Sequence, residues 1–308
     1  MLDVFESLLP VFLVIALGVF LKQIRFISDE AWQGMEKVAF WVMFPALLVE
    51  SIVRADLAGI GASRLAATLI VSVLTFGLIV WLLRRPLQRI LQMNGPAYTS
   101  FFQGATRWNA FIALAVVARL YGQDGLTLMA VALGSMIPVL QVTNVLILSA
   151  YAADEPPSWR RLARTLLRNP LLWACVIGIA INLLGIPIYE PLLTAANVIG
   201  RGGLGVGLLV VGAGLAVRDV LRPGAAVLVT ALFKFALFPA LTAAICFAFG
   251  LTGLEFYVAM LAAAMPTATN GYILARQMGG DAPLLASIVT FQTAVAIVTV
   301  PLTMWLVS

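Results

Sequence analysis

The chain has 308 residues, of which 62% are hydrophobic and 11% are charged, and its formal net charge is +5. Soluble domains are about half apolar and a quarter charged, so this composition excludes a water-soluble globular protein and a disordered chain. The sequence has no histidine, which excludes His-liganded metals and Ser-His-Asp triads, and its two cysteines, Cys175 and Cys246, both lie in apolar runs, which excludes a disulfide scaffold.

Ten apolar segments are long enough to cross a bilayer, for which a helix needs about 20 residues. The predicted spans are 4–22, 33–52, 63–84, 99–120, 126–150, 169–186, 190–216, 223–249, 255–277 and 283–307. We therefore predict an all-α polytopic membrane protein with ten transmembrane helices. Asp3 and Glu6 precede the first apolar run and Lys22 and Arg25 follow it, which is the reverse of a cleaved signal peptide, so this helix is expected to be retained.

The distribution of lysine and arginine predicts the orientation. Twelve of these residues fall in the loops that follow odd-numbered spans, and three, Arg54, Arg64 and Arg119, fall in the loops on the other side. Because cytoplasmic loops carry the excess of positive charge, both termini are predicted to lie outside. The segment 151–168 is then a cytoplasmic basic connector, read either as an amphipathic helix against the headgroups or as a solvated loop.

The two halves of the chain resemble each other. The segment TRWNAFI at 106–112 resembles TATNGYI at 267–273, and five residues from Ala118 to Leu128 recur 157 positions later. With five spans in each half, the halves insert in opposite orientations, which is the inverted repeat of secondary transporters. The predicted repeats are 1–150 and 169–308, joined by the 151–168 connector, with scaffold and transport domains that each mix both repeats.

Spans four and nine carry the unusual residues. Pro266 should interrupt span nine, since proline removes a backbone donor, and a polar run interrupts span four. Paired broken helices are the best sequence indication of a transport site, because freed backbone groups and half-helix N-termini face the ligand there. The predicted crossing and helix-break residues are Gly104, Pro45, Pro266 and Gly271, and the predicted substrate ligands are Arg107, Asn109, Thr106, Asn270, Thr267, Thr269 and Lys234.

Arg107 and Lys234 are cations predicted to lie deep in spans four and eight. A charged residue at that depth is a functional-site hypothesis, and a guanidinium suits bidentate binding of a carboxylate. The alternative for both is a structural role beside the broken helices. No carboxylate falls clearly at a span centre, since Glu36 and Glu50 are expected near the two ends of span two, and this pattern favours an anionic substrate over a metal ion.

Further polar residues are placed where they either line a cavity or join helices by hydrogen bonds. They are Gln103, Gln141, Asn144, Tyr272, Gln292 and Thr293. The glycine-rich stretch 200–207 in span seven is expected to allow close helix packing.

The motifs FPALL in span two, KFALFPAL in span eight, RWNAF in span four and MPTATNGYILARQMGGD in span nine resemble the auxin efflux carrier family. The resemblance covers essentially all ten spans. It implies a fold similar to bile-acid sodium symporters, with two inverted five-helix repeats and helices four and nine crossing at their breaks. Carried over to this chain, the crossing involves Asn109, Pro266 and Asn270.

The sequence departs from the plant branch of that family in two ways. It has no proline between Pro96 and Pro138, so a break in span four must use Gly104 and the polar run, and its cytoplasmic loop is short. Span four also reads GATRWN where many bacterial members have a GNTG-like stretch. These departures argue against assuming auxin as the substrate.

The function predicted from these features is transport of a small organic anion, a mono- or dicarboxylate, by an elevator-type secondary transporter or uniporter in the bacterial cytoplasmic (inner) membrane. The alternatives are a sodium-coupled symporter of a bulkier organic anion, with Gln292 and Thr293 as sodium ligands, and a cation/proton antiporter of the same fold. No enzyme activity, cofactor, metal or nucleic-acid partner is expected. The sequence leaves open whether transport is coupled to sodium, to protons or to neither. A homodimer through the scaffold domain is also left open, and contact with membrane lipid is expected.

Overall fold

The computed structural model describes residues 2–55, 62–152, 159–215 and 223–307, and within these ranges the chain is helical and has no strand. The helices are α1 (Leu2–Gln23), α2 (Asp29–Val38), α3 (Phe44–Val53), α4 (Ala62–Leu82), α5 (Arg84–Ile90), α6 (Gly95–Thr106), α7 (Ala110–Tyr151), α8 (Trp159–Leu167), α9 (Pro170–Leu183), α10 (Glu190–Ala213), α11 (Ala225–Leu232), α12 (Phe238–Ala248), α13 (Gly253–Ala264), α14 (Asn270–Gln277) and α15 (Ala282–Val307).

Six helical stretches in the described ranges are long and apolar enough to cross a membrane. They are Phe5–Gln23, Ser63–Leu82, Gly95–Tyr151, Glu190–Ala213, Ala225–Ala248 and Ala282–Val307. The apolar helices α9 and α13 are shorter, with 14 and 12 residues. The all-helical prediction is confirmed for the described residues, whereas the ten separate spans stay a prediction, since α7 runs through parts of predicted spans four and five.

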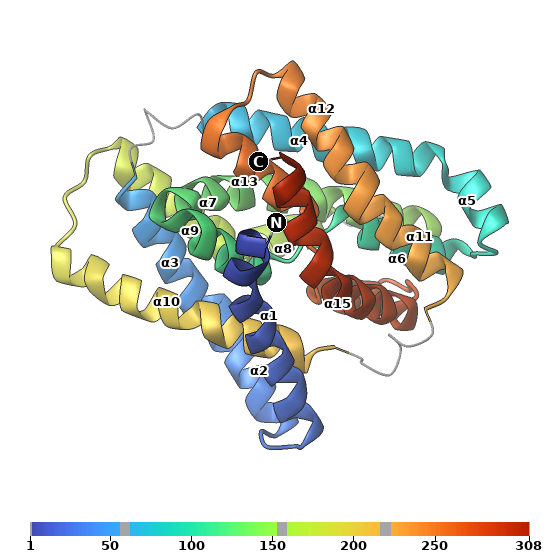
Figure 1. Ribbon diagram of the computed structural model, residues 1–308, viewed down its shortest axis with the longest axis horizontal. Coiled ribbons are helices and arrows are strands. Elements are labelled where there is room, and N and C mark those ends of the chain that lie inside the picture. The colour runs from blue at the N-terminus through green and yellow to red at the C-terminus, as the bar shows by residue number, and fades with distance from the viewer. Residues whose placement is uncertain (1, 56–61, 153–158, 216–222, 308) are drawn as a thin grey trace.

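The helices pack as two groups. Helix α10 lies against α1 and α3, and α3 also packs on α9. In Figure 1, α3, α9 and α10 lie on the left, and α1 and α2 run down to the bottom centre. In the second group α4 packs on α7 and α12, while α13 contacts α7, α12 and α15 and α6 contacts α7 and α15. Helix α7 also touches α1, α3, α9 and α10, so it lies at the boundary between the two groups.

Glycines allow the first group to pack closely. A Cβ atom added to Gly200 would lie 2.7 Å from the Leu47 backbone of α3, and one added to Gly212 would lie 2.0 Å from the Ile15 carbonyl oxygen of α1. Any larger side chain at these positions would force the helices apart. The glycine-rich stretch of span seven therefore serves close helix packing, as its composition predicts.

Two π-helical turns, Ala39–Met43 and Phe233–Leu237, each precede a Phe-Pro pair. Because Pro45 and Pro239 lack a backbone donor, a wider turn before each of them lets the helix continue without a break. Pro45 thus lies at the start of α3 in an otherwise continuous helical segment. The second π-helical turn contains Lys234.

Gly122 separates the predicted spans four and five. Its backbone has φ 58° and ψ −140°, a conformation that L residues with side chains rarely adopt, and it kinks α7 at this point. Residues 153–158 of the predicted basic connector lie outside the described residues. The rest of the connector forms α8, in which Arg160 and Arg164 are exposed.

Candidate functional site

The first helix break follows α6. Arg107 leaves the helix with an extended backbone (φ −71°, ψ 159°), and α7 begins three residues later. The Asn109 side-chain oxygen accepts hydrogen bonds from the Phe111 and Ile112 N–H groups at 3.0 and 3.2 Å, which is N-cap geometry. The break is therefore formed by a polar cap and needs no proline. Gly104, predicted as the break residue, is itself helical inside α6, because the helix is terminated by the extended Arg107 and not by the glycine.

The second helix break lies between α13 and α14. Met265 has an extended backbone (φ −68°, ψ 139°) and Pro266 follows it, so the chain leaves the helix at the position where proline is predicted to interrupt it. Gly271, also predicted as a break residue, lies within α14, where an added Cβ would lie 3.4 Å from Gln103 Oε1 and 3.2 Å from Leu285. This glycine thus allows α14 to approach α6 and α15.

The two breaks are joined by hydrogen bonds. The Asn109 N–H donates to the Pro266 carbonyl at 2.8 Å, and the Thr267 hydroxyl donates to the Gly104 carbonyl at 2.6 Å. Gln292 of α15 links both breaks, since its oxygen accepts from the Thr267 N–H and its amide donates to the Gly104 carbonyl, both at 3.0 Å. The backbone groups freed by the interruptions are thereby paired inside the protein, as a membrane-embedded break requires.

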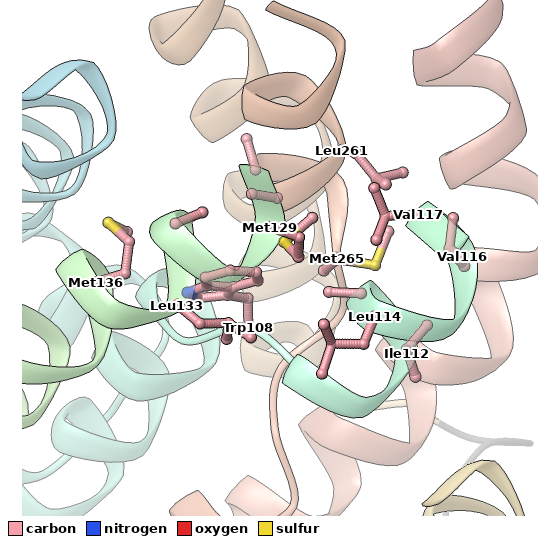
Figure 2. Packing of buried hydrophobic residues seen from close by; sticks show 14 of the residues in the cluster. Trp108, Ile112, Leu114, Val116, Val117, Met129, Leu133, Met136, Leu261 and Met265 are labelled. Atoms are coloured by element: carbon pink, nitrogen blue, oxygen red, sulfur yellow. The ribbon is translucent and has the colours of Figure 1, made fainter. Parts of the chain in front are cut away.

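Apolar side chains surround the crossing. Figure 2 shows Leu261 and Met265 near Val117 of α7, and the ring of Trp108 beside Leu133. Trp108 is buried and belongs to the main hydrophobic core. The polar atoms of the two breaks are therefore held within a packed apolar shell, where an unmade hydrogen bond is costly.

A cavity of about 260 Å³ lies beside the breaks. It is lined by residues of the first break and of the start of α7, by the chain before and within α14, and by α2, α7 and the start of α9. The lining residues are Glu36, Phe40, Arg107, Trp108, Asn109, Ala110, Phe111, Leu133, Ile137, Leu140, Gln141, Asn169, Leu171, Ala268, Thr269 and Ile273.

Arg107 is the main positive group of this cavity. It is 7% exposed, and its Nη2 atom donates to the Gln141 side-chain oxygen at 3.2 Å. The first residues of α7, Ala110 and Phe111, also line the cavity, so the positive end of that helix dipole acts together with the guanidinium. The arrangement suits a small anion with a carboxylate group and an apolar body.

A second cavity, of about 380 Å³, adjoins the first. The two share Glu36, Thr269 and Ile273, and the second is also lined by Tyr272 and by residues of α10 and α15. Both cavities lie toward the end of the molecule where α2 and α9 begin and α10 ends.

At the opposite end, polar contacts join the end of α3 to neighbouring helices. Glu50 is buried and forms an ion pair with Arg54 at 2.8 Å, and Arg54 also pairs with Glu190. Gln123, next to the α7 kink, donates to Glu50 at 3.2 Å, and the Asn182 amide donates to the carbonyls that end α3. The cavities therefore lie on one side of the breaks and a hydrogen-bonded cluster lies on the other.

The structure brings some predicted site residues to the cavities and places others elsewhere. Arg107, Asn109, Gln141, Thr269 and Tyr272 line them. Thr267 and Gln292 are used in the crossing, while the Thr106, Asn144 and Thr293 side chains bond to carbonyls of their own helices. Gln103 is fully buried beside Gly271, and the Asn270 side chain lies outside the described residues.

Lys234 lies away from both cavities. It is fully buried on the π-helical turn, and its Nζ atom is 4.8 Å from the centroid of the Phe238 ring. No hydrogen-bond partner for this atom occurs in the part of the chain that the structure describes.

Sequence reasoning missed several cavity residues: Glu36, Phe111 and Asn169. The sequence predicts Glu36 only as an acid near a span end, and no local pattern connects it with the two breaks. Asn169 directly precedes Pro170, a combination typical of a helix N-terminus, but only the packing of α9 brings it to the cavity.

The comparison with known proteins agrees with this geometry. The family described as membrane transport protein matches residues 3–153 and 156–304. The chain is also 28% identical over 306 residues to an uncharacterized transporter of Methanothermobacter thermautotrophicus, with 96% of each protein covered. Both matches include the two breaks and the cavity. The protein is therefore an integral membrane protein that belongs to the membrane transport protein family, the auxin efflux carrier family that its span motifs resemble.

Proposed function

We propose that this protein is a secondary transporter or uniporter for small organic anions that carry a carboxylate, and not an enzyme. The observation that carries the proposal is the cavity in which Arg107, Gln141 and the N-terminus of α7 converge beside two broken helices. A carboxylate can receive two hydrogen bonds from a guanidinium, and the apolar lining accepts the rest of a small anion.

The proposed architecture is ten transmembrane helices in two inverted repeats, 1–150 and 169–308. In this arrangement α1, α2, α3, α9 and α10 form a scaffold, and the helices that contact the breaks form a transport domain. The division is supported by the two packing groups, which meet along α7 and where α1 packs on α15. Movement of the second group against the first is the elevator-type mechanism that we propose.

The proposed orientation has both termini outside and the 151–168 connector in the cytoplasm of a bacterial cell. It rests on the excess of lysine and arginine in the loops after odd-numbered spans. The cavities then lie on the cytoplasmic side of the breaks, since they lie where α2 and α9 begin, and the Glu50–Arg54–Glu190 cluster lies on the outer side.

The test is uptake of labelled organic anions into proteoliposomes. Acetate, malonate and malate are compared for the wild-type protein, Arg107→Ala and Lys234→Met. We expect uptake of at least one of these anions by the wild type, loss of uptake in Arg107→Ala, and uptake by Lys234→Met, since that buried cation lies outside both cavities. Equal uptake by Arg107→Ala and the wild type would overturn the role of the cavity.

A further inference from the structure

The acidic residue Glu36 stands out among the groups that line the cavities. It is half-buried on α2 and lines both cavities, together with Thr269 and Ile273 from the second break. Arg107 comes from the first break, and α2 belongs to the other packing group. The cavity therefore has a positive group on one helix group and a negative group on the other.

Glu36 is not among the carboxylates that form ion pairs in the described part of the chain. Most of the other residues that line the first cavity are apolar and include Phe40, Leu133 and Ile273. Of the other titratable groups, Tyr272 lines the second cavity, and Glu30 and Lys37 lie on α2 outside both linings. Arg107 is thus the cation among the lining residues of the two cavities, and because it is the group proposed to hold the first carboxylate, the negative charge of Glu36 acts on the rest of a bound ligand.

A ligand whose carboxylate contacts Arg107 has its remaining atoms inside a space of about 260 Å³. A second carboxylate on a short anion would then lie in the same space that Glu36 lines. Like charges repel strongly where solvent screening is weak, and specificity is often obtained by such an unfavourable contact with the wrong ligand.

We propose that Glu36 sets the charge selectivity of the cavity, so that it accepts a monocarboxylate and rejects the dicarboxylate dianion of the same length. This inference rests on the proposed function, in which Arg107 holds the first carboxylate. It narrows the mono- or dicarboxylate substrate class to the singly charged members.

The experiment measures equilibrium binding to the purified, detergent-solubilised protein by calorimetry at neutral pH. The probes are two matched pairs, propionate with malonate and butyrate with succinate. We expect the wild type to bind each monocarboxylate about tenfold more tightly than its dicarboxylate partner, the size expected for one added like charge at partial screening.

Glu36→Gln removes the charge and keeps the shape, so it should bring the ratio of the two affinities close to one by tightening dicarboxylate binding. Glu36→Asp keeps the charge and should retain the preference. Glu30→Gln, an exposed residue on the same helix that lines neither cavity, is the matched control and should behave as the wild type.

The outcomes separate this inference from the proposed function. If Arg107→Ala abolishes binding of both acids but Glu36→Gln leaves their ratio unchanged, the role of Glu36 is wrong and the anion site stands. A wild type that prefers the dicarboxylates also overturns the role of Glu36, even if Glu36→Gln fails to fold. If the wild type binds neither acid, or Arg107→Ala binds both normally, the proposed function fails and this inference fails with it.

Discussion

Arg107 and Lys234 are both buried cations in apolar helices, yet their surroundings differ. Arg107 lies in an extended segment between two helices, lines a cavity and donates to Gln141. Lys234 lies on a π-helical turn inside a continuous helix, packed against Phe238 and away from both cavities. Arg107, at the interrupted helix, thus lines a cavity large enough for a small ligand. Lys234, in the uninterrupted helix, is instead enclosed by neighbouring side chains.

The sharpest test of this contrast is removal of the Arg107 guanidinium. Arg107→Ala should weaken binding of a carboxylate by about 100-fold, because hydrogen bonds to charged groups contribute about 1.5–3 kcal/mol each. Arg107→Lys keeps the charge but not the planar fork and should lose less affinity. The affinities of both variants are measured by calorimetric titration with a carboxylate that the wild type binds. Undiminished binding by Arg107→Ala would contradict the conclusion that Arg107, unlike Lys234, contacts the ligand.

The crossing beside Arg107 should depend on hydrogen bonds, whereas the surroundings of Lys234 depend on packing. Gln292→Ala removes two hydrogen bonds that link the breaks and should lower the free energy of unfolding by about 2 kcal/mol. The measurement is the thermal unfolding temperature in detergent. Thr299→Val is the control on the same helix, since its hydroxyl bonds only to Val295, and an equal shift in both variants would contradict a special role for the crossing.

Lys234→Met should have a smaller effect of the opposite sign. The substitution replaces a buried amino group without a hydrogen-bond partner among the described residues by an apolar side chain of similar length. We expect a rise in stability of about 1 kcal/mol and carboxylate binding within a factor of about two of the wild type. Thermal unfolding and calorimetry check the two parts, and a loss of binding would bring Lys234 into the anion site.

The smallest effect on stability is expected for the exposed ion pair between Lys22 and Asp29. Its loss shows how little an exposed charge contributes in comparison with the two buried cations. The hydrogen bond from Lys22 holds the pKa of the Asp29 carboxyl below its usual value of about 4. Because the folded-state pKa is lowered, the stabilisation is present above about pH 4 and is lost as the pH falls through the folded-state pKa. Asp29→Asn should therefore lower the unfolding temperature slightly at pH 7 and not at all at about pH 2. If the unfolding temperature of the variant is also lower at about pH 2, the loss of the ion pair is not the cause.

The sequence predicts the helical class, the two interrupted segments and the importance of Arg107 and Asn109, because proline, capping residues and charges in apolar runs are local signals. The location of Lys234 could not be predicted, since depth in the membrane does not tell which neighbours surround a side chain. Glu36 was underestimated for a related reason. Its position near a span end is visible in the sequence, but its place in both cavities depends on how α2 packs beside the second break.

The bond between the Asn109 N–H and the Pro266 carbonyl has a mechanical consequence. Pulling one interrupted helix away from the other would leave backbone groups without partners at a cost of several kcal/mol each, so the two would move together in the elevator-type movement that we propose. The boundary between the two helix groups, where α7 meets α1, α3, α9 and α10 and where α1 meets α15, has polar contacts at the end of α3, and the proposed sliding would exchange them. In the elevator-type movement that we propose, Arg107 would move with the crossing while Glu36 and Leu171 stayed with the other helix group, so the walls of the cavity would change during each cycle.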